Sequence, residues 1–259
     1  MTAKLTHKLN NDVWAILPDY HGAIARQLQE HDYADNGYEL PQPEEESGIA
    51  IIHIHGAVGK LLTDFERMLG MTDYDDIAEQ VADADTNPNI NSILLHIDSP
   101  GGTITGLPEL AAKLRNVSKP LVAYTEGTAA SAAYWIASQA DSVLLSESAE
   151  VGSVGVYVAL LDQTEYLRNM GLKVNAVSAG ENKLDYADFK PLSEEARERL
   201  QANVDKWHTR FKEEINNKRN VPEASMTGQT YEGLEAVEAS LADGVVNDLA
   251  DVIGLMANL

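Results

Sequence analysis

The sequence predicts an α/β fold built on a mostly parallel β-sheet that is flanked by helices. Three observations lead to this prediction: short apolar, β-branched segments recur between residues 48 and 180, segments with helical spacing separate them, and glycines close several of the apolar segments. Strand and helix alternate four or more times, which is typical of βαβ units. With 259 residues the chain can form one large domain of this class or two small ones.

The composition restricts the possible partners. There are 19 basic and 41 acidic side chains, so the formal net charge is −22. Nucleic acids and anionic membranes select basic surfaces, and we therefore expect neither as the main partner. The absence of cysteine excludes disulfides, thiolate metal sites and a cysteine nucleophile. No apolar run reaches the roughly 18 residues of a membrane span, and the N-terminus lacks the apolar core of a secretory signal. A cytoplasmic location is therefore expected.

The first two segments of the chain differ in residue pattern from the rest. Residues 1–40 predict a helical N-terminal arm, because Ile16, Leu17, Ile24 and Leu28 recur close to helical spacing. Residues 41–48, PQPEEESG, predict an acidic, proline-containing linker that is solvated. The main domain is expected over residues 49–249, and residues 250–259 are expected to form a C-terminal tail.

Glycine, proline and asparagine residues mark the expected turns, and these turns divide the main domain into strands and helices. Strands are predicted at 48–56, 90–102, 119–127, 142–147 and 172–180, and 152–160 is predicted as a strand or a loop at a strand edge. Helices are predicted at 72–89, 106–118, 129–141, 164–171 and 191–220, followed by a small helical segment at 227–249. Ser193 is the expected N-cap of the long helix, whose apolar stripe comprises Leu200, Val204, Trp207, Phe211 and Ile215.

Two motifs at predicted strand ends could contribute to chemistry. DSPGG, residues 98–102, follows an apolar strand, and its glycines would let backbone N–H groups approach a ligand or a developing oxyanion. The alternative is a tight turn that needs glycine. Ser131 follows a strand and Gly127 and opens a helix, which is a strand–turn–helix setting for a nucleophile. The alternative is a helix N-cap or a small packing residue.

A serine nucleophile needs a base, and two residue types could supply it. His53 and His55 share one face of a strand, and His96 precedes the DSPGG motif, but none lies in a recognisable triad motif, and neither does His208. His53 and His55 could also bind a metal, yet the sequence shows no evident third ligand, so we predict no metal site. Lys183 lies just past a predicted strand end, where functional loops of such sheets are found.

Four blocks, in order, resemble the signal peptide peptidase A family of Ser/Lys-dyad serine peptidases, and most closely its phage and prophage branch. They are HIDSPGG, TEGTAASAAYWIASQAD, VGSVGVYVALLD and SAGENKLDYADFKPLSEEARERLQ, and YEGLEAVEASLADGVV resembles the closing segment of the family. The resemblance implies the fold of Clp protease and crotonase, a twisted, mostly parallel sheet with flanking helices that assembles into rings.

The resemblance also implies a set of roles. Ser131 would be the nucleophile, Lys183 the general base, and Ser153 the residue that orients the lysine. The backbone N–H of Gly102, with that of Gly101, would bind the oxyanion. No cofactor is implied. In some members of the family the serine and the lysine meet across a subunit boundary.

The resemblance further implies a polypeptide substrate, namely a scaffold or capsid-assembly protein that is processed inside a phage procapsid. Three other functions fit parts of the pattern. A Clp-type Ser-His-Asp peptidase would share the first two motifs, although no histidine lies between His96 and His208. An inert assembly subunit or a crotonase-like acyl-CoA enzyme could use the same fold.

Overall fold

The structure, a computed structural model, describes residues 13–16 and 42–258. Its main sheet has six strands in the order β13-β10-β8-β6-β3-β2. Their bounds are Gly244–Val245, Ser142–Leu145, Leu121–Thr125, Ser92–Asp98, Ile49–His55 and Glu44–Glu46. Neighbouring strands are parallel except at the β2 edge, where β2 runs antiparallel to β3. The parallel sheet expected from the alternation of strand and helix is therefore present.

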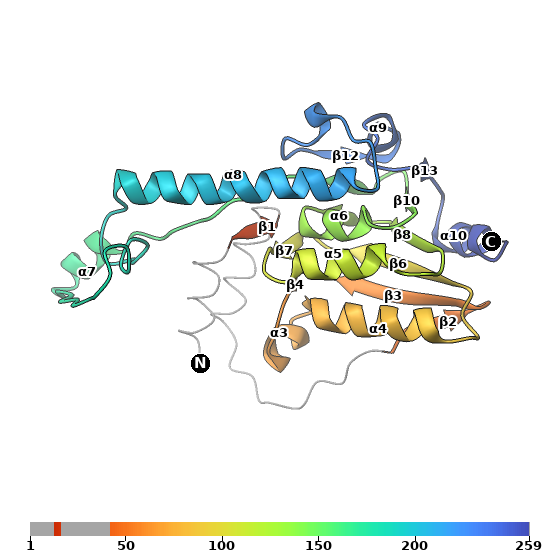
Figure 1. The fold of residues 1–259 in the computed structure, drawn as a ribbon, viewed down its shortest axis with the longest axis horizontal. Coiled ribbons are helices and arrows are strands. Elements are labelled where there is room, and N and C mark those ends of the chain that lie inside the picture. The colour runs from red at the N-terminus through yellow and green to blue at the C-terminus, as the bar shows by residue number, and fades with distance from the viewer. Residues whose placement is uncertain (1–12, 17–41, 259) are drawn as a thin grey trace.

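Helices cover both faces of this sheet. α4 (Tyr74–Thr86), α5 (Leu107–Arg115) and α6 (Ala132–Ala137) pack side by side on one face (Figure 1). α10 (Leu249–Met256) packs on the other through Val252 and Met256. The strands are apolar on both faces for this reason: in β3, Ala50, Ile52 and Ile54 join the larger core, while Ile49 and Ile51 join the core under α10.

Two smaller sheets form where the chain leaves the carboxyl ends of the main strands. One has the order β1-β7-β4-β5, with bounds Trp14–Ile16, Gly101–Thr103, Val58–Gly59 and Thr72–Asp73. The other has the order β12-β11-β9, with bounds Thr230–Glu232, Glu150–Gly152 and Thr128–Ala130. Four neighbouring strands of the main sheet are each followed directly by a strand of a smaller sheet: β3 by β4, β6 by β7, β8 by β9 and β10 by β11. The remaining short elements are α3 (Asp64–Met68), η1 (Glu223–Ser225) and α9 (Gly233–Glu238).

The longest helix, α8 (Glu194–Asn216), packs on α6 through its C-terminal half. Phe211 stacks on Trp135 of α6 with ring centroids 4.6 Å apart, and Ile215 is buried nearby. The N-terminal half of α8 extends beyond the sheet (Figure 1). Residues 158–193 form a long segment that leads away from the sheet and contains α7 (Thr164–Asn169) at its far end. We call residues 158–193 the arm. No residue of α7 is buried, so the end of the arm packs little against the rest of its own chain.

Several expected segments differ in the structure. Residues 44–46 of the expected linker form strand β2, because their backbone pairs with β3 while the glutamate side chains stay in solvent. Residues 14–16 of the expected helical arm form β1 against the glycine turn, and the rest of 1–40 lies outside the described residues. The predicted strand at 172–180 has no strand partner and is exposed. Most of the expected tail is helix α10.

Candidate active site

Ser131 lies between β9 and α6, at the first residue of a sharp strand-to-helix turn. Its backbone angles are φ 56° and ψ −118°, and this positive φ is strained for any residue with a Cβ. Its backbone N–H donates to the carbonyl oxygen of Gly152 at 2.7 Å, which fixes the turn against β11. A strained serine at such a turn is the geometry of a presented nucleophile.

The position of Ser131 is that of an N-cap, but its side chain does not act as one. An N-cap serine normally accepts a hydrogen bond from an N–H group of the first helical turn, and no such bond is made here. Instead the Ser131 Oγ donates to the carbonyl oxygen of Gly155 at 3.3 Å. The side chain is 1% exposed, so the hydroxyl lies beneath the surface of the single chain. Capping therefore does not explain the serine.

Ser153 emerges beside Ser131 from the neighbouring strand. Ala130 of β9 is paired in register with Gly152 of β11, and the two serines are the next residue on each strand. Ser153 also has a positive φ, 51°, and its N–H donates to the carbonyl oxygen of Gln229 at 2.7 Å. Two strained, buried serines thus leave adjacent parallel strands at the same edge.

The glycine turn after β6 lies against the same place. A Cβ on Gly101, whose φ is 104°, would lie 3.0 Å from both the Ala130 oxygen and the Ala132 nitrogen. A Cβ on Gly102 would lie 1.7 Å from the Val58 oxygen, so neither position admits a side chain. The N–H of Gly101 donates to Ser99 Oγ at 3.2 Å, and Gly102 lies within β7, paired in register with Ala15 of β1 and Val58 of β4.

Lys183 is not in this group within one chain. It lies on the arm, in a turn where its N–H donates to the Gly180 oxygen at 3.2 Å. Its residue is exposed, and its amine makes no hydrogen bond or ion pair with the residues that the structure describes. Figure 1 shows the end of the arm far from α6. The structure therefore brings together Ser131, Ser153 and Gly101, but not Lys183.

The described histidines do not offer a base to Ser131 either. The His208 Nε2 lies 3.1 Å from the carbonyl oxygens of Val154 and Met226, which ties α8 to the chain just before Gly155. His53, His55 and His96 lie on the sheet face that α10 covers, on β3 and β6. None of these four hydrogen-bonds the serine, and this arrangement disfavours a Clp-type Ser-His-Asp site.

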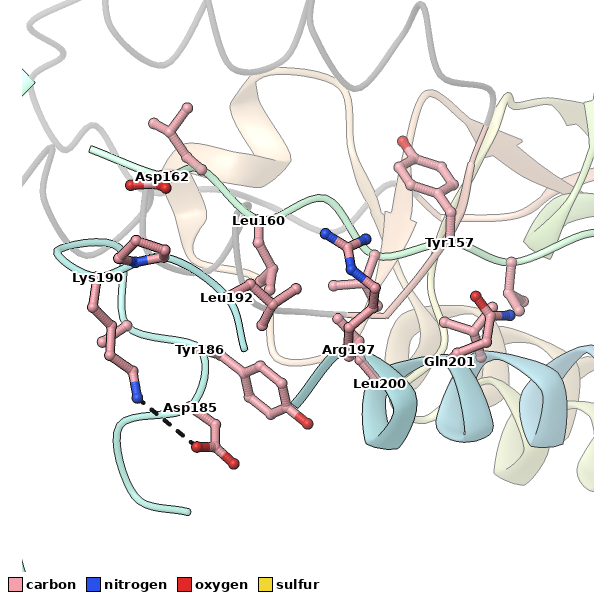
Figure 2. A pocket seen from close by; sticks show the side chains of 16 residues that line it. Tyr157, Leu160, Asp162, Asp185, Tyr186, Lys190, Leu192, Arg197, Leu200 and Gln201 are labelled. Atoms are coloured by element: carbon pink, nitrogen blue, oxygen red, sulfur yellow. Dashed lines mark ion pairs between the residues drawn. The ribbon is translucent and has the colours of Figure 1, made fainter. Parts of the chain in front are cut away.

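A cavity of about 720 Å³ opens along the chain directly after Gly155. Figure 2 shows Tyr157 and Leu160 on one side of it, facing Arg197 and Leu200 of α8. Asp185, on the arm, forms ion pairs with Lys190 and Arg199 beside it. Neither Ser131 nor Lys183 lines the cavity. It is a mixed apolar and charged groove at the base of the arm, and sequence patterns gave no signal for it.

Comparison with known proteins places this arrangement in a family. The profile of Peptidase family S49 matches residues 113–259, and that of Clp protease matches residues 58–150. The head-tail preconnector protein GP5 of Enterobacteria phage P21 is 30% identical over 82% of this chain and 43% of its own length. The capsid assembly protease C of Escherichia phage lambda is 28% identical over 81% of this chain and 49% of its own length.

A cellular relative and a solved structure complete the comparison. Protease 4 of Salmonella typhi is 30% identical over 100% of this chain and 43% of its own length. The chain thus spans less than half the length of these three relatives. A crystal structure of an enoyl-CoA hydratase/isomerase family member aligns with a TM-score of 0.47 and 18% identity, covering 84% of this chain and 76% of that one.

The family profile covers more than half of the chain and includes Ser131, Ser153 and Lys183. The Clp protease profile covers the strands and helices from β4 to the start of β11, which confirms the expected fold class. In the residues that the structure describes, no helix is both long and apolar enough to cross a membrane. The chain belongs to peptidase family S49.

Proposed function

We propose that this protein is a serine endopeptidase in which Ser131 is the nucleophile and Lys183 is the general base. The observation that supports this most strongly is the strained Ser131, whose Oγ does not cap α6 and which lies where β9, β11 and the glycine turn meet. Membership of a peptidase family agrees with this use of the serine.

The proposed reaction follows from these positions. The neutral amine of Lys183 accepts the proton of the Ser131 Oγ as that oxygen attacks a peptide carbonyl. The backbone N–H of Gly102 stabilises the resulting oxyanion, and Gly101 contributes if its bond to Ser99 opens. The ammonium group then protonates the departing amine, which breaks the peptide bond and leaves an acyl-enzyme. Water, deprotonated by the same lysine, hydrolyses the ester and frees the serine.

The lysine is proposed to come from a second chain. Lys183 has no partner within the described part of its own chain, and its arm extends away from α6. The arm also exposes apolar side chains that a neighbouring subunit could cover: Leu161, Tyr166, Met170, Leu172, Val174 and Val177. Ser153, buried beside Ser131, would accept or donate a hydrogen bond to the incoming amine and hold it in place.

A complementation experiment tests both the dyad and its origin. We expect Ser131→Ala and Lys183→Ala chains to be inactive alone, and a refolded mixture of them to regain part of the cleavage of casein. A mixed oligomer then contains sites with Ser131 from one chain and Lys183 from the other. An inactive mixture of well-assembled variants would contradict the sharing of sites, and activity in either variant alone would contradict the dyad.

The proposed substrate is a scaffold or capsid-assembly protein, and the proposed place of action is the host cytoplasm or the procapsid. This rests on the phage relatives, one of which is named as a capsid assembly protease. Mass spectrometry of the candidate scaffold after incubation with wild type or Ser131→Ala would show cut sites only with wild type. A fluorophosphonate probe should label Ser131 in the assembled protein, and the absence of both labelling and cutting would favour an inert assembly subunit.

A further inference from the structure

Three histidines meet on the sheet face opposite α4 and α5. The parallel register of β3 and β6 places His53 beside His96, and His55 is two residues further along β3 on the same face. One ring nitrogen from each of the three lies within 4.8 Å of the other two. The sequence showed no evident third ligand beside His53 and His55, because the pairing of β3 with β6 is not visible in it.

From this cluster we propose a site for a single Zn²⁺ ion, bound by His53, His55 and His96. Tetrahedral Zn²⁺ with nitrogen ligands at 2.0–2.1 Å needs nitrogens about 3.3 Å apart. The Nδ1 atoms of His53 and His96 are already 3.2 Å apart. The exposed His55 side chain has room to close the remaining distance. Imidazole suits Zn²⁺ and neighbouring transition metals, whereas Mg²⁺ and Ca²⁺ prefer oxygen.

The surroundings of the three rings fit a cation. The Glu44 Oε1 lies 3.6 Å from His53 Nε2, and the Glu126 Oε1 lies 3.9 Å from His96 Nε2. Each carboxylate lies at the Nε2 end of its ring, so it could orient a ligand that binds the ion through Nδ1. The His53 Nε2 is buried and makes no hydrogen bond.

The scaffold under the cluster is rigid. The His96 side chain is 12% exposed and stacks on Tyr124 of β8 with ring centroids 5.7 Å apart. Ile49 and Ile51 continue the same face of β3 under α10, which leaves the carboxyl end of the face to the histidines. β6 ends at Asp98, two residues after His96, and the Oγ of the next residue, Ser99, accepts a hydrogen bond from the Gly101 N–H. A bound ion would therefore brace the strand that leads into the proposed oxyanion turn.

Isothermal titration of the full chain, without a polyhistidine tag and stripped with chelator, tests the site with ZnCl₂ alone. We expect one Zn²⁺ per chain, and at least a tenfold weaker affinity in H55Q and in H55Q/H96Q. H208Q is the matched control, since His208 is the other histidine in the described part of the chain, and it should keep the wild-type affinity. Circular dichroism checks that each variant is folded, and the exposed His55 makes H55Q informative if the double variant fails to fold.

Thermal unfolding gives a second measurement that does not depend on catalysis. A metal that binds only the folded state raises the melting temperature. Zn²⁺ should therefore raise it in wild type and in H208Q, and raise it less in H55Q. Wild-type affinity in folded H55Q/H96Q, or no saturable Zn²⁺ binding by the wild type, would overturn the proposal. Cleavage by Ser131 and Lys183 is not needed for either result.

Discussion

At the scale of single residues, the active-site candidates are defined by backbone strain more than by side-chain contacts. Ser131 and Ser153 hold positive φ angles on adjacent strand ends, and Gly101 and Gly102 close the same corner with no room for a Cβ. Such strain costs on the order of 1–3 kcal/mol per residue and persists where the surrounding structure enforces it. Because the strain lowers stability, a functional role explains the two serines better than a contribution to stability does.

This strain can be measured by comparing two variants that lack the Ser131 hydroxyl. Alanine keeps the Cβ that makes φ 56° unfavourable at position 131, whereas glycine removes it. We expect Ser131→Gly to unfold at a higher temperature than Ser131→Ala, by roughly 1 kcal/mol in stability. Differential scanning calorimetry gives the two values. A less stable glycine variant would mean that the turn is not strained.

A lysine base also predicts the pH dependence of cleavage. Only the neutral amine can take the serine proton, so kcat/KM for a fixed peptide should rise as the pH is raised from mildly acid to alkaline. The control is the unfolding temperature over the same range, which separates titration of the base from loss of structure. A flat profile with a folded protein would count against Lys183.

At the scale of elements, long regular segments were predictable and short ones were not. The predicted strands at 48–56, 119–127 and 142–147 and the predicted helix at 191–220 match β3, β8, β10 and α8 to within a few residues. The strands of the two smaller sheets have two or three residues, which is too short for an alternating pattern to be recognised. Segment 172–180 has the alternation of a strand but pairs with no strand in the described part of the chain.

The candidate site was predictable only in part, for the same reason. Ser131, Ser153, Gly101 and Gly102 each follow a strand, and parallel strands bring their carboxyl ends to one edge. The meeting of His53 with His96 depends on strand order and register, which a single sequence does not encode locally. The separation of Lys183 from Ser131 depends on the direction of the arm, which no local pattern specifies.

The attachment of α8 predicts a stability effect. Glu214 on this helix is 4% exposed and pairs with Arg115 of α5 and Arg210 of α8. We expect Glu214→Ala to lower the free energy of unfolding by about 3 kcal/mol, because it leaves Arg115 without its buried counter-charge. Urea unfolding followed by tryptophan fluorescence measures this. Glu213→Ala, at an exposed neighbouring position, is the control and should change stability little.

At the scale of the whole molecule, the exposed apolar side chains of the arm are not explained by contacts within one chain. It places apolar side chains in solvent, and Val177 is 100% exposed. Large apolar side chains gathered in solvent on one segment often mark an interface. The arm and the N-terminal half of α8 are therefore expected to lie between subunits of a homo-oligomer, which we expect to be a ring.

Charge placed on the arm should weaken this assembly. We expect Val177→Asp to shift the protein toward smaller species in light scattering coupled to size-exclusion chromatography, and to lower cleavage in parallel. Asn175→Asp adds the same charge at an exposed polar position and should leave the assembly intact. Equal effects of the two substitutions would point to charge repulsion alone, and no effect of Val177→Asp would remove the arm from the interface.

The β2 edge has a consequence for how copies of this protein can associate. An exposed edge strand usually offers its free backbone groups to the strand of another molecule. Here all three residues of β2 are glutamates with exposed side chains, in a chain whose net charge is −22. A second copy that approached through its own β2 would bring three more carboxylates against them. Repulsion therefore opposes the pairing of two β2 edges and protects this edge from sheet-to-sheet association.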